Sequence, residues 1–390
     1  MGLAVQAAVA AAAVAGSTSG CGRRPPWPRG PAQNAGGFRG RVEVAGGLGP
    51  GGPSVVNRSY LVRLPRGYDA AQRHPLLLVF HGVTSSAAIT AASNGLERLA
   101  GDEAGWVVVH PEGLGDVPAE WEPPSRWNVS TWQSWNGSGT VGSPGPLGAT
   151  CAPGAHKQPG APCYRSCGNC RDHCWWTTCA DDVGFVAQLL DQLQGLLCLD
   201  TSRFVATGFS NGAIFLYDLA AHENIAKRLA AIAPFAGLPN LGFYTPPARS
   251  TRLRLFGLWG REDLSVPGFR SVSSYGKPPM EGINVAANGW YYYSERAVVQ
   301  GWLAASGAEG GEGSLTAFHT PFDGELGLTC RAEGSSALVV ACAWDGVHAW
   351  AGAGPCLRAP AQPIPDGAPG PLASRLLVHA LLRRLPPSPD

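Results

Sequence analysis

One stretch of the sequence decides the fold, and it reads Phe204-Val205-Ala206-Thr207-Gly208-Phe209-Ser210-Asn211-Gly212. Residues 204–207 form a brief apolar run with strand composition, and residues 211–222 have helical composition. Ser210 therefore lies between a predicted strand and a predicted helix, with a glycine two positions away on either side. The G-x-S-x-G pattern is common by itself. In this context it predicts a sharp turn that lifts the serine hydroxyl clear of the sheet, and the alternative is an ordinary glycine-rich turn.

Short apolar runs recur on both sides of this turn. They end abruptly at Gly, Pro or polar residues, which is typical of strands buried on both faces of a parallel sheet, and they cover residues 59–64, 76–80, 106–110, 230–236, 253–259 and 337–344. Helices are predicted over residues 91–100, 182–197 (capped by Asp181 or Asp182), 211–222, 291–306 and 372–385. Strands that alternate with helices predict an α/β fold with a mostly parallel central sheet flanked by helices.

Residues 114–180 interrupt this alternation. They show little periodicity and contain six of the thirteen tryptophans, namely Trp121, Trp127, Trp132, Trp135, Trp175 and Trp176. Cysteines crowd into the same region, at Cys151, Cys163, Cys167, Cys170, Cys174 and Cys179. We interpret this stretch as an insertion linked by disulfides rather than as an independent domain.

The eleven cysteines of the chain favour an oxidising destination. Cys330 and Cys342 flank a predicted hairpin and are a further candidate disulfide. Zinc is the competing interpretation, because Cys167-x-x-Cys170 has His173 and Cys174 nearby. A second paired knuckle is not evident in the sequence, so disulfides are favoured and no metal site is predicted. An odd number of cysteines leaves at least one unpaired, and Cys21 is the expected remainder.

The termini and the composition suggest a secreted protein with one large domain. Residues 1–20 contain an alanine-rich apolar run followed by small residues, which resembles a signal peptide, although a basic start is missing. Residues 21–54 are rich in Gly and Pro and are expected to be a flexible lead-in, with a single domain over 55–390. No apolar run reaches the length of a membrane span. The formal net charge is only +1, without a basic stripe that would indicate nucleic acid.

A serine hydroxyl needs a base to act as a nucleophile. On a sheet with such a turn, the chain order is serine, then acid, then histidine, which leaves His319, His348 and His379 of the nine histidines. His379 lies within the last predicted helix, and His319 lies in a polar loop. His348 follows the predicted strand 337–344, and the loops at the carboxyl ends of strands are where sheet enzymes keep their reactive groups. We therefore expect His348 to be the base.

Asp263 is the expected acid, because it follows the predicted strand 253–259 closely. Such an aspartate would fix the histidine tautomer by accepting the Nδ1 proton. A plain loop-turn role is its alternative. The rivals are the adjacent Glu262, the later Asp323 and Asp345, and Asp218, which sits on the predicted helix behind Ser210 and should point away from it.

The oxyanion formed on attack would need two backbone donors. One is expected from the amide of Asn211, directly after the serine, and the other from the amide of Val83, in the loop that follows the strand 76–80. His81, in the same loop, is expected to pack or to fix the loop rather than to carry a proton.

Five motifs occur in the same order as in a known family. They are His81-Gly82, Asp181-Asp182-Val183-Gly184-Phe185, Gly208-Phe209-Ser210-Asn211-Gly212, Gly260-x-x-Asp263-x-x-Val266-Pro267 and His348-x-Trp350-x-Gly352. Over residues 59–352 the chain thus resembles the extracellular feruloyl esterase and polyhydroxybutyrate depolymerase family. The resemblance implies an α/β-hydrolase domain without metal or organic cofactor, a triad on Ser210, Asp263 and His348, and esters of plant phenolics, acetylated sugars or polyhydroxyalkanoates as substrates.

The chain departs from the family pattern in three places. Trp259 stands where a histidine is usual, Ala351 replaces a common proline, and the cysteine-rich insertion is longer than is typical. The first two leave the chemistry intact, whereas the third puts the choice of substrate in doubt.

Four tryptophans are candidate substrate contacts, namely Trp135, Trp176, Trp259 and Trp350. The alternative for those of the insertion is that they pack its small core. Two other functions compete with a monomeric secreted esterase: a serine peptidase of the same superfamily, which would need a gating domain, and a carbohydrate- or polymer-binding protein that kept the fold without turnover.

Overall fold

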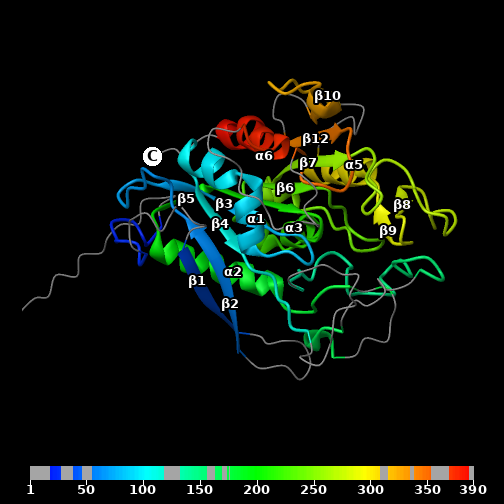
Figure 1. Ribbon diagram of the computed structural model, residues 1–390, viewed down its shortest axis with the longest axis horizontal. Coiled ribbons are helices and arrows are strands. Elements are labelled where there is room, and N and C mark those ends of the chain that lie inside the picture. Colours follow the sequence, from blue (N-terminus) through cyan, green and yellow to red (C-terminus); the bar gives the residue numbers. More distant parts are fainter. Residues whose placement is uncertain are drawn as a thin grey trace, which may run out of the picture.

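The computed structural model describes residues 18–27, 38–45, 55–117, 132–155, 163–168, 174, 176–307, 315–333, 338–352 and 369–385. A central sheet runs through the molecule in the order β1-β2-β4-β3-β5-β6-β7-β12-β11-β10 (Figure 1). Its strands are β1 (Phe38–Ala45), β2 (Val55–Arg63), β3 (His74–Phe80), β4 (Val107–Pro111), β5 (Leu199–Phe209), β6 (Ala231–Phe235), β7 (Arg254–Gly260), β10 (Leu315–Ala317), β11 (Thr329–Glu333) and β12 (Val339–Trp344). The neighbours from β4 to β12 pair in parallel, and the outer strands on both sides pair antiparallel.

The sheet is buried on both faces. Strands β3, β4 and β6 are buried at every position, which explains their continuous apolar sequence. Leu76, Leu78 and Phe80 of β3 belong to one core, and Leu77 and Val79 belong to a second core on the opposite face. The chain thus has the α/β fold with a mostly parallel central sheet flanked by helices that the alternating elements predict.

Helices cover both of these cores. They are α1 (Ala87–Asn94), α2 (Asp182–Leu196), α3 (Asn211–Ala221), α4 (Glu223–Ala226), α5 (Glu295–Ser306) and α6 (Leu372–Leu376), with helical turns at η2 (Glu97–Asp102), η3 (Arg165–Cys167), η4 (Arg249–Thr251), η6 (Glu325–Gly327), η7 (Leu377–Leu381) and η8 (Leu382–Arg384). Buried residues of α2, α3 and α5 join the first core, and those of α6 and η7 join the second. Figure 1 accordingly shows α2 and α6 on opposite sides of the sheet.

The structure differs from the sequence-based prediction at β1. Residues 38–45, assigned above to the lead-in, form a strand that pairs antiparallel with β2. Val42 and Val44 are buried, whereas Arg41 and Glu43 are exposed. Charged and buried apolar residues alternate along this edge strand, which is the pattern of a strand with one exposed face, but the run is short and stands within a Gly- and Pro-rich stretch.

Two predicted helices also differ. The helix predicted over 91–100 is divided, because α1 ends at Gly95, which has φ 69°, and the chain continues into η2. The start of the helix predicted over 291–306 is instead strand β9 (Tyr291–Tyr293), which pairs with β8 (Ile283–Val285). Consecutive tyrosines favour a strand. Helix α5 begins only at Glu295, where the Ser294 side chain accepts a hydrogen bond from the Ala297 amide.

Disulfides join Cys21 to Cys198, Cys151 to Cys174, Cys167 to Cys179, and Cys330 to Cys342. Cys163 is also in a disulfide, while Cys170 and His173 lie outside the described residues. The zinc interpretation is therefore wrong for Cys167 and Cys174, whose sulfurs are covalently occupied.

The expectation that Cys21 stays unpaired is also wrong. Its partner Cys198 directly precedes β5, a pairing that sequence spacing cannot reveal. Beside it, the Thr18 hydroxyl donates to the Leu197 carbonyl, and the Gly20 amide donates to the Gln194 carbonyl. Residues 18–20, assigned above to a leader, therefore contact the main domain. In the described part of the chain, no helix combines the length and the apolar character that crossing a membrane requires.

Candidate active site

Ser210 lies in the tight turn between β5 and α3. Its backbone adopts φ 54° and ψ −120°, an unusual conformation for a residue other than glycine, and its amide donates to the Phe235 carbonyl at 3.0 Å. The glycines on both sides allow the turn to close. A Cβ on Gly208 would lie 2.7 Å from the Gly212 carbonyl carbon, and one on Gly212 would lie 2.5 Å from the Phe80 and His81 carbonyl oxygens. These contacts are those of a nucleophile elbow.

The structure brings Ser210, His348 and Asp263 together from three separate segments. The His348 Nε2 atom lies 2.8 Å from the Ser210 Oγ, and its Nδ1 lies 2.7 Å from the Asp263 Oδ2. Asp263 follows β7 and His348 follows β12, which is the parallel neighbour of β7. The carboxyl ends of parallel strands meet at one edge of a sheet, and this convergence joins residues that are far apart along the chain.

The Asp263 carboxylate is held from both of its oxygens. It is only 2% exposed, and its Oδ1 accepts hydrogen bonds from the amides of Ser265 and Val266, each at 2.8 Å. The second oxygen is thereby aimed at His348. With Nδ1 donating to Asp263, Nε2 is left as the acceptor for the serine hydroxyl.

The rival acids have other partners. Asp345 pairs with Arg261 at 2.7 Å, Glu262 pairs with Arg270 at 3.1 Å, and Asp323 pairs with His319 at 2.9 Å. Asp218 accepts hydrogen bonds from Ser138. His319 is exposed, so its pair with Asp323 is a surface contact.

The loop after β3 packs against the elbow. A Cβ on Gly82 would lie 3.4 Å from the Ser210 Cβ, and Val83 lines the cavity beside the serine. His81 is fully buried. Its Nδ1 donates to the Gly82 carbonyl at 2.7 Å, and its Nε2 accepts from the Gly113 amide at 2.9 Å. The His81 ring therefore fixes this loop through both of its nitrogens, with the Glu112 Oε1 3.3 Å from its Nε2.

A mostly apolar cavity of about 150 Å³ opens beside the Ser210 hydroxyl. It is bounded by α1, by the loop after Asp263, by the segment before β9 and by the cysteine-rich insertion. Its larger lining side chains are Ile89, Thr90, Trp176, Phe209, Val266, Trp290, Tyr292, His348 and Trp350. An apolar cavity of this volume can hold one benzene ring.

Two of the four candidate tryptophans line this cavity and two do not. Trp176 and Trp350 are lining residues. Trp135 and Trp259 are buried in the core, where their indole nitrogens donate to the carbonyls of His81 and Gly237, each at 3.0 Å. The expectation that these two contact substrate is therefore not met, because each satisfies its polar atom inside the protein. Trp121, Trp127 and Trp175 lie outside the described residues.

Several wall residues were not predicted. Ile89 and Thr90 come from α1, and Trp290 and Tyr292 come from the segment at β9. The position of α1 directly after the predicted loop at His81 was an available signal. Trp290 and Tyr292 have no such signal in the sequence, because Tyr292 lies within the helix predicted over 291–306 and Trp290 reaches the cavity through a tertiary contact with the insertion.

Burial shifts the pKa of two titratable groups, His110 behind the cavity and Tyr292 in its wall. Burial lowers the pKa of His110 to about 3, with the nearby His81 as a lesser cause, and the His110 Nε2 lies 3.3 Å from the Asn94 Nδ2. Burial also raises the pKa of Tyr292, and the charge of Asp263 raises it further.

Comparisons with known proteins find similarity at the level of structure alone. No family model and no curated protein matches the sequence. Among solved structures, the acetyl xylan esterase from Aspergillus awamori is 13% identical, with 80% of this chain and 94% of that chain covered and a TM-score of 0.45. A thermostable esterase is 11% identical, with 69% of this chain covered and a TM-score of 0.39, and this chain spans about half of its length (52%). The S-formylglutathione hydrolase from Agrobacterium tumefaciens is 16% identical, with 59% and 77% covered and a TM-score of 0.34.

Proposed function

We propose that the chain is a serine carboxylic-ester hydrolase with Ser210 as nucleophile, His348 as general base and acid, and Asp263 as the group that orients His348. The observation that supports this proposal is the unbroken series of hydrogen bonds from Asp263 through His348 to Ser210, at 2.7 Å and 2.8 Å, beside an apolar cavity. Nucleophile, base and orienting acid within hydrogen-bond reach are the requirements of acyl transfer.

The reaction would proceed through an acyl-enzyme. His348 takes the Ser210 proton as the hydroxyl oxygen attacks the ester carbonyl, and the amides of Val83 and Asn211 donate to the oxyanion. The tetrahedral intermediate then loses the alcohol, which receives the proton from His348. Water, deprotonated by His348, attacks the acyl-enzyme and releases the acid and the free serine.

The cavity supports an acyl group of limited size. A volume of about 150 Å³ with Trp176, Trp290 and Trp350 in its wall suits one aromatic ring or a short aliphatic acid. We therefore propose esters of phenolic acids or of short hydroxy acids as substrates, in line with the sequence resemblance to feruloyl esterases and polyhydroxybutyrate depolymerases. The disulfides support secretion as the setting, because such bonds persist in oxidising compartments.

The test is covalent labelling followed by turnover. A fluorophosphonate probe is expected to label the folded wild type at Ser210, and Ser210→Ala is expected to abolish labelling. Hydrolysis of methyl ferulate, acetylated xylan and hydroxybutyrate oligomers should fall by about 10⁴-fold or more in Ser210→Ala and in His348→Gln. Absence of labelling at Ser210, together with absence of turnover on all three substrates, would favour the non-catalytic binding protein.

A further inference from the structure

We propose that Trp135, in the cysteine- and tryptophan-rich insertion, is a positioning residue that holds the two segments of the oxyanion hole in register. This inference rests on the proposed function. Trp135 is 0% exposed, does not line the cavity, and contacts both the elbow and the loop after β3.

The contact with the elbow is a two-point hydrogen bond. The Trp135 backbone amide donates to the Asn211 Oδ1 at 2.7 Å, and the Asn211 Nδ2 donates to the Trp135 carbonyl at 2.9 Å. The Asn211 side chain is fully buried, so both of its polar atoms are satisfied by one residue of the insertion. Two hydrogen bonds to one backbone unit fix the orientation of Asn211, whose own amide is the proposed donor.

The contact with the second segment uses the indole ring. The Trp135 Nε1 donates to the His81 carbonyl at 3.0 Å, two residues before Val83. One residue after Val83, the Thr84 amide donates to the carbonyl of Gln133 at 3.0 Å. The amide of Val83 is thus bracketed by two hydrogen bonds to a single short stretch of the insertion.

The ring also packs between the elements that carry the two donors. It stacks on Phe215 of α3 at 5.5 Å between centroids, and it meets Phe80 at the end of β3 edge-on at 5.1 Å. Helix α3 begins with Asn211, and β3 leads directly into the loop with Val83. Trp135 therefore contacts both segments through the backbone, the indole nitrogen and the ring.

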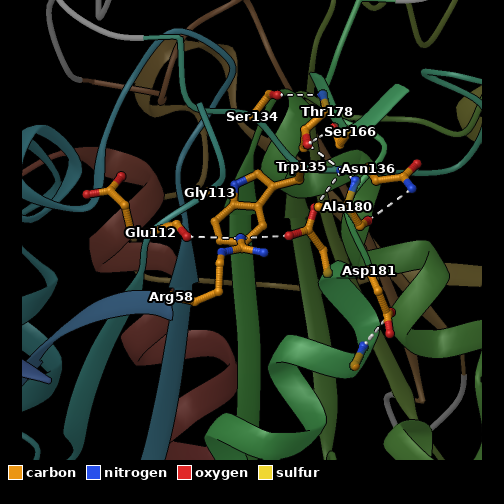
Figure 2. A network of polar contacts seen from close by, with 12 residues as sticks. Arg58, Glu112, Gly113, Ser134, Trp135, Asn136, Ser166, Thr178, Ala180 and Asp181 are labelled. Atoms are coloured by element: carbon orange, nitrogen blue, oxygen red, sulfur yellow. Dashed lines mark hydrogen bonds and ion pairs between the residues drawn. The ribbon is translucent and has the colours of Figure 1, made fainter. Parts of the chain in front are cut away.

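A buried ion pair between Arg58 and Asp182 supports the stretch that carries Trp135, and Figure 2 shows Arg58 beside the Trp135 ring. The next amide along the chain, that of Asn136, donates to the Asp182 Oδ2 at 2.8 Å. Asp182 pairs with Arg58 at 2.7 Å, and Arg58 also donates to the Glu112 carbonyl at 3.1 Å. Both charged side chains are almost fully buried, so their positions are fixed by partners rather than shared with water. Trp135 is thereby linked to β2, to α2 and to the residue that follows β4.

This arrangement matters because two oxyanion donors act only at a defined separation. Catalytic groups need to be held within about 0.5 Å of the productive geometry, and loss of one donor costs about 10²–10³ in kcat. Displacing a donor without removing it should cost less. The expected signature is a fall in kcat with little change in KM, because the oxyanion exists only after attack.

Trp135→Phe is the decisive variant, since it keeps a ring in the core and removes the hydrogen bond to His81. Trp302→Phe is the matched control: Trp302 is 1% exposed, and its Nε1 donates to the Leu253 carbonyl at 3.1 Å away from the site. We expect Trp135→Phe to lower kcat about 10- to 100-fold, with KM within about 3-fold, and to slow fluorophosphonate labelling in parallel. Trp302→Phe should lower Tm by a similar amount and leave kcat and labelling unchanged.

Asn211→Ala provides a second variant that breaks the two-point contact and leaves the backbone amide in place. It should reproduce the fall in kcat and in labelling rate, so the inference stays testable if Trp135→Phe does not fold. Equal kcat values for Trp135→Phe and Trp302→Phe, or a loss confined to KM, would overturn the positioning role while Ser210 still labels. Failure of wild type to label at Ser210 would instead overturn the proposed function itself.

Discussion

At the scale of single residues, the strained backbone of Ser210 depends on the two glycines that lie two positions away on either side, Gly208 and Gly212. A residue other than glycine at a positive φ of this kind costs about 1–3 kcal/mol, and the surrounding structure must impose it. Gly208 and Gly212 let the elbow, β3 and α3 approach within backbone contact. The geometry of the serine is therefore a property of the packing around the turn and not of the serine alone.

Gly212→Ala should disrupt this packing. The new Cβ would lie 2.5 Å from two backbone carbonyl oxygens, those of Phe80 and His81, and neither can move without shifting β3. We expect a loss of stability of about 2–4 kcal/mol and loss of activity, measured by urea unfolding and ester hydrolysis. Gly195→Ala is the control, because Gly195 lies in α2 with open space around its Cβ position, and it should gain about 0.5–1 kcal/mol. Similar behaviour of the two variants would contradict this account.

His110 should make the stability of the protein depend on pH. Its pKa in the fold is lowered to about 3 by burial, against about 6.5 in the unfolded chain. The unfolded state therefore binds a proton that the folded state does not, and stability is lost as the pH falls from about 6.5 towards 3. His110→Gln removes this titration and keeps a polar acceptor for Asn94.

The measurement is the free energy of unfolding at pH 7 and at pH 5 for both proteins. Between these values the wild type should lose about 2 kcal/mol more than His110→Gln, because other titrating groups are common to both and cancel. Parallel profiles would show that His110 takes up its proton in the fold as readily as in the unfolded chain.

At the scale of elements, the predictable parts are those in which local sequence and burial agree. The strands β3, β4, β7 and β12, and the second half of β5, are recognisable in the sequence as short apolar runs that the fold buries. Strand β1 was not predicted because its short alternation of charged and apolar residues stands within a Gly- and Pro-rich stretch. The hairpin of β8 and β9 was not predicted because Tyr291–Tyr293 is too short to be distinguished in the sequence from the helix that follows. The insertion has no period at all, so its course depends on disulfides and on contacts such as those of Trp135.

The insertion should also set the preference for the acyl group. Trp176 lies two residues after Cys174, which forms a disulfide with Cys151. The backbone of Cys151 pairs with that of Trp290 in an isolated antiparallel β-bridge. In the cavity wall, the ring centroids of Trp176 and Trp290 are 6.2 Å apart. Trp176→Ala should lower kcat/KM for methyl ferulate about 10- to 100-fold and leave that for an acetyl ester within about 3-fold. Leu147→Ala, at an exposed residue of the same insertion, should change neither ratio. An equal loss on both esters would mean that Trp176 supports the wall without selecting the substrate.

At the scale of the whole molecule, the candidate triad was predictable and the cavity was not. Ser210, Asp263 and His348 each follow a recognisable strand, and parallel strands deliver their carboxyl ends to one edge whatever lies between them. Tyr292 reaches the cavity from a segment for which a helix was predicted, and Trp290 reaches it from the residue just before that segment. Trp259, although it is close to the predicted acid Asp263, is buried in the core. The direction in which a side chain points depends on the register of its strand and on the packing around it, and neither can be read from a single sequence.

The disulfide between Cys21 and Cys198 is also a contact between residues far apart in the sequence, and it closes a loop of 177 residues. The disulfide between Cys330 and Cys342 closes a loop of 12 residues. Chain-entropy estimates give about 5 kcal/mol for the first loop and about 3 kcal/mol for the second. Cys21→Ala/Cys198→Ala should therefore lower Tm more than Cys330→Ala/Cys342→Ala. Cys198 lies at the opposite end of β5 from Ser210, so kcat at 25 °C should match wild type in the first double variant. Equal losses of Tm, or a lower kcat without unfolding, would show that the N-terminal segment stabilises the domain by another route.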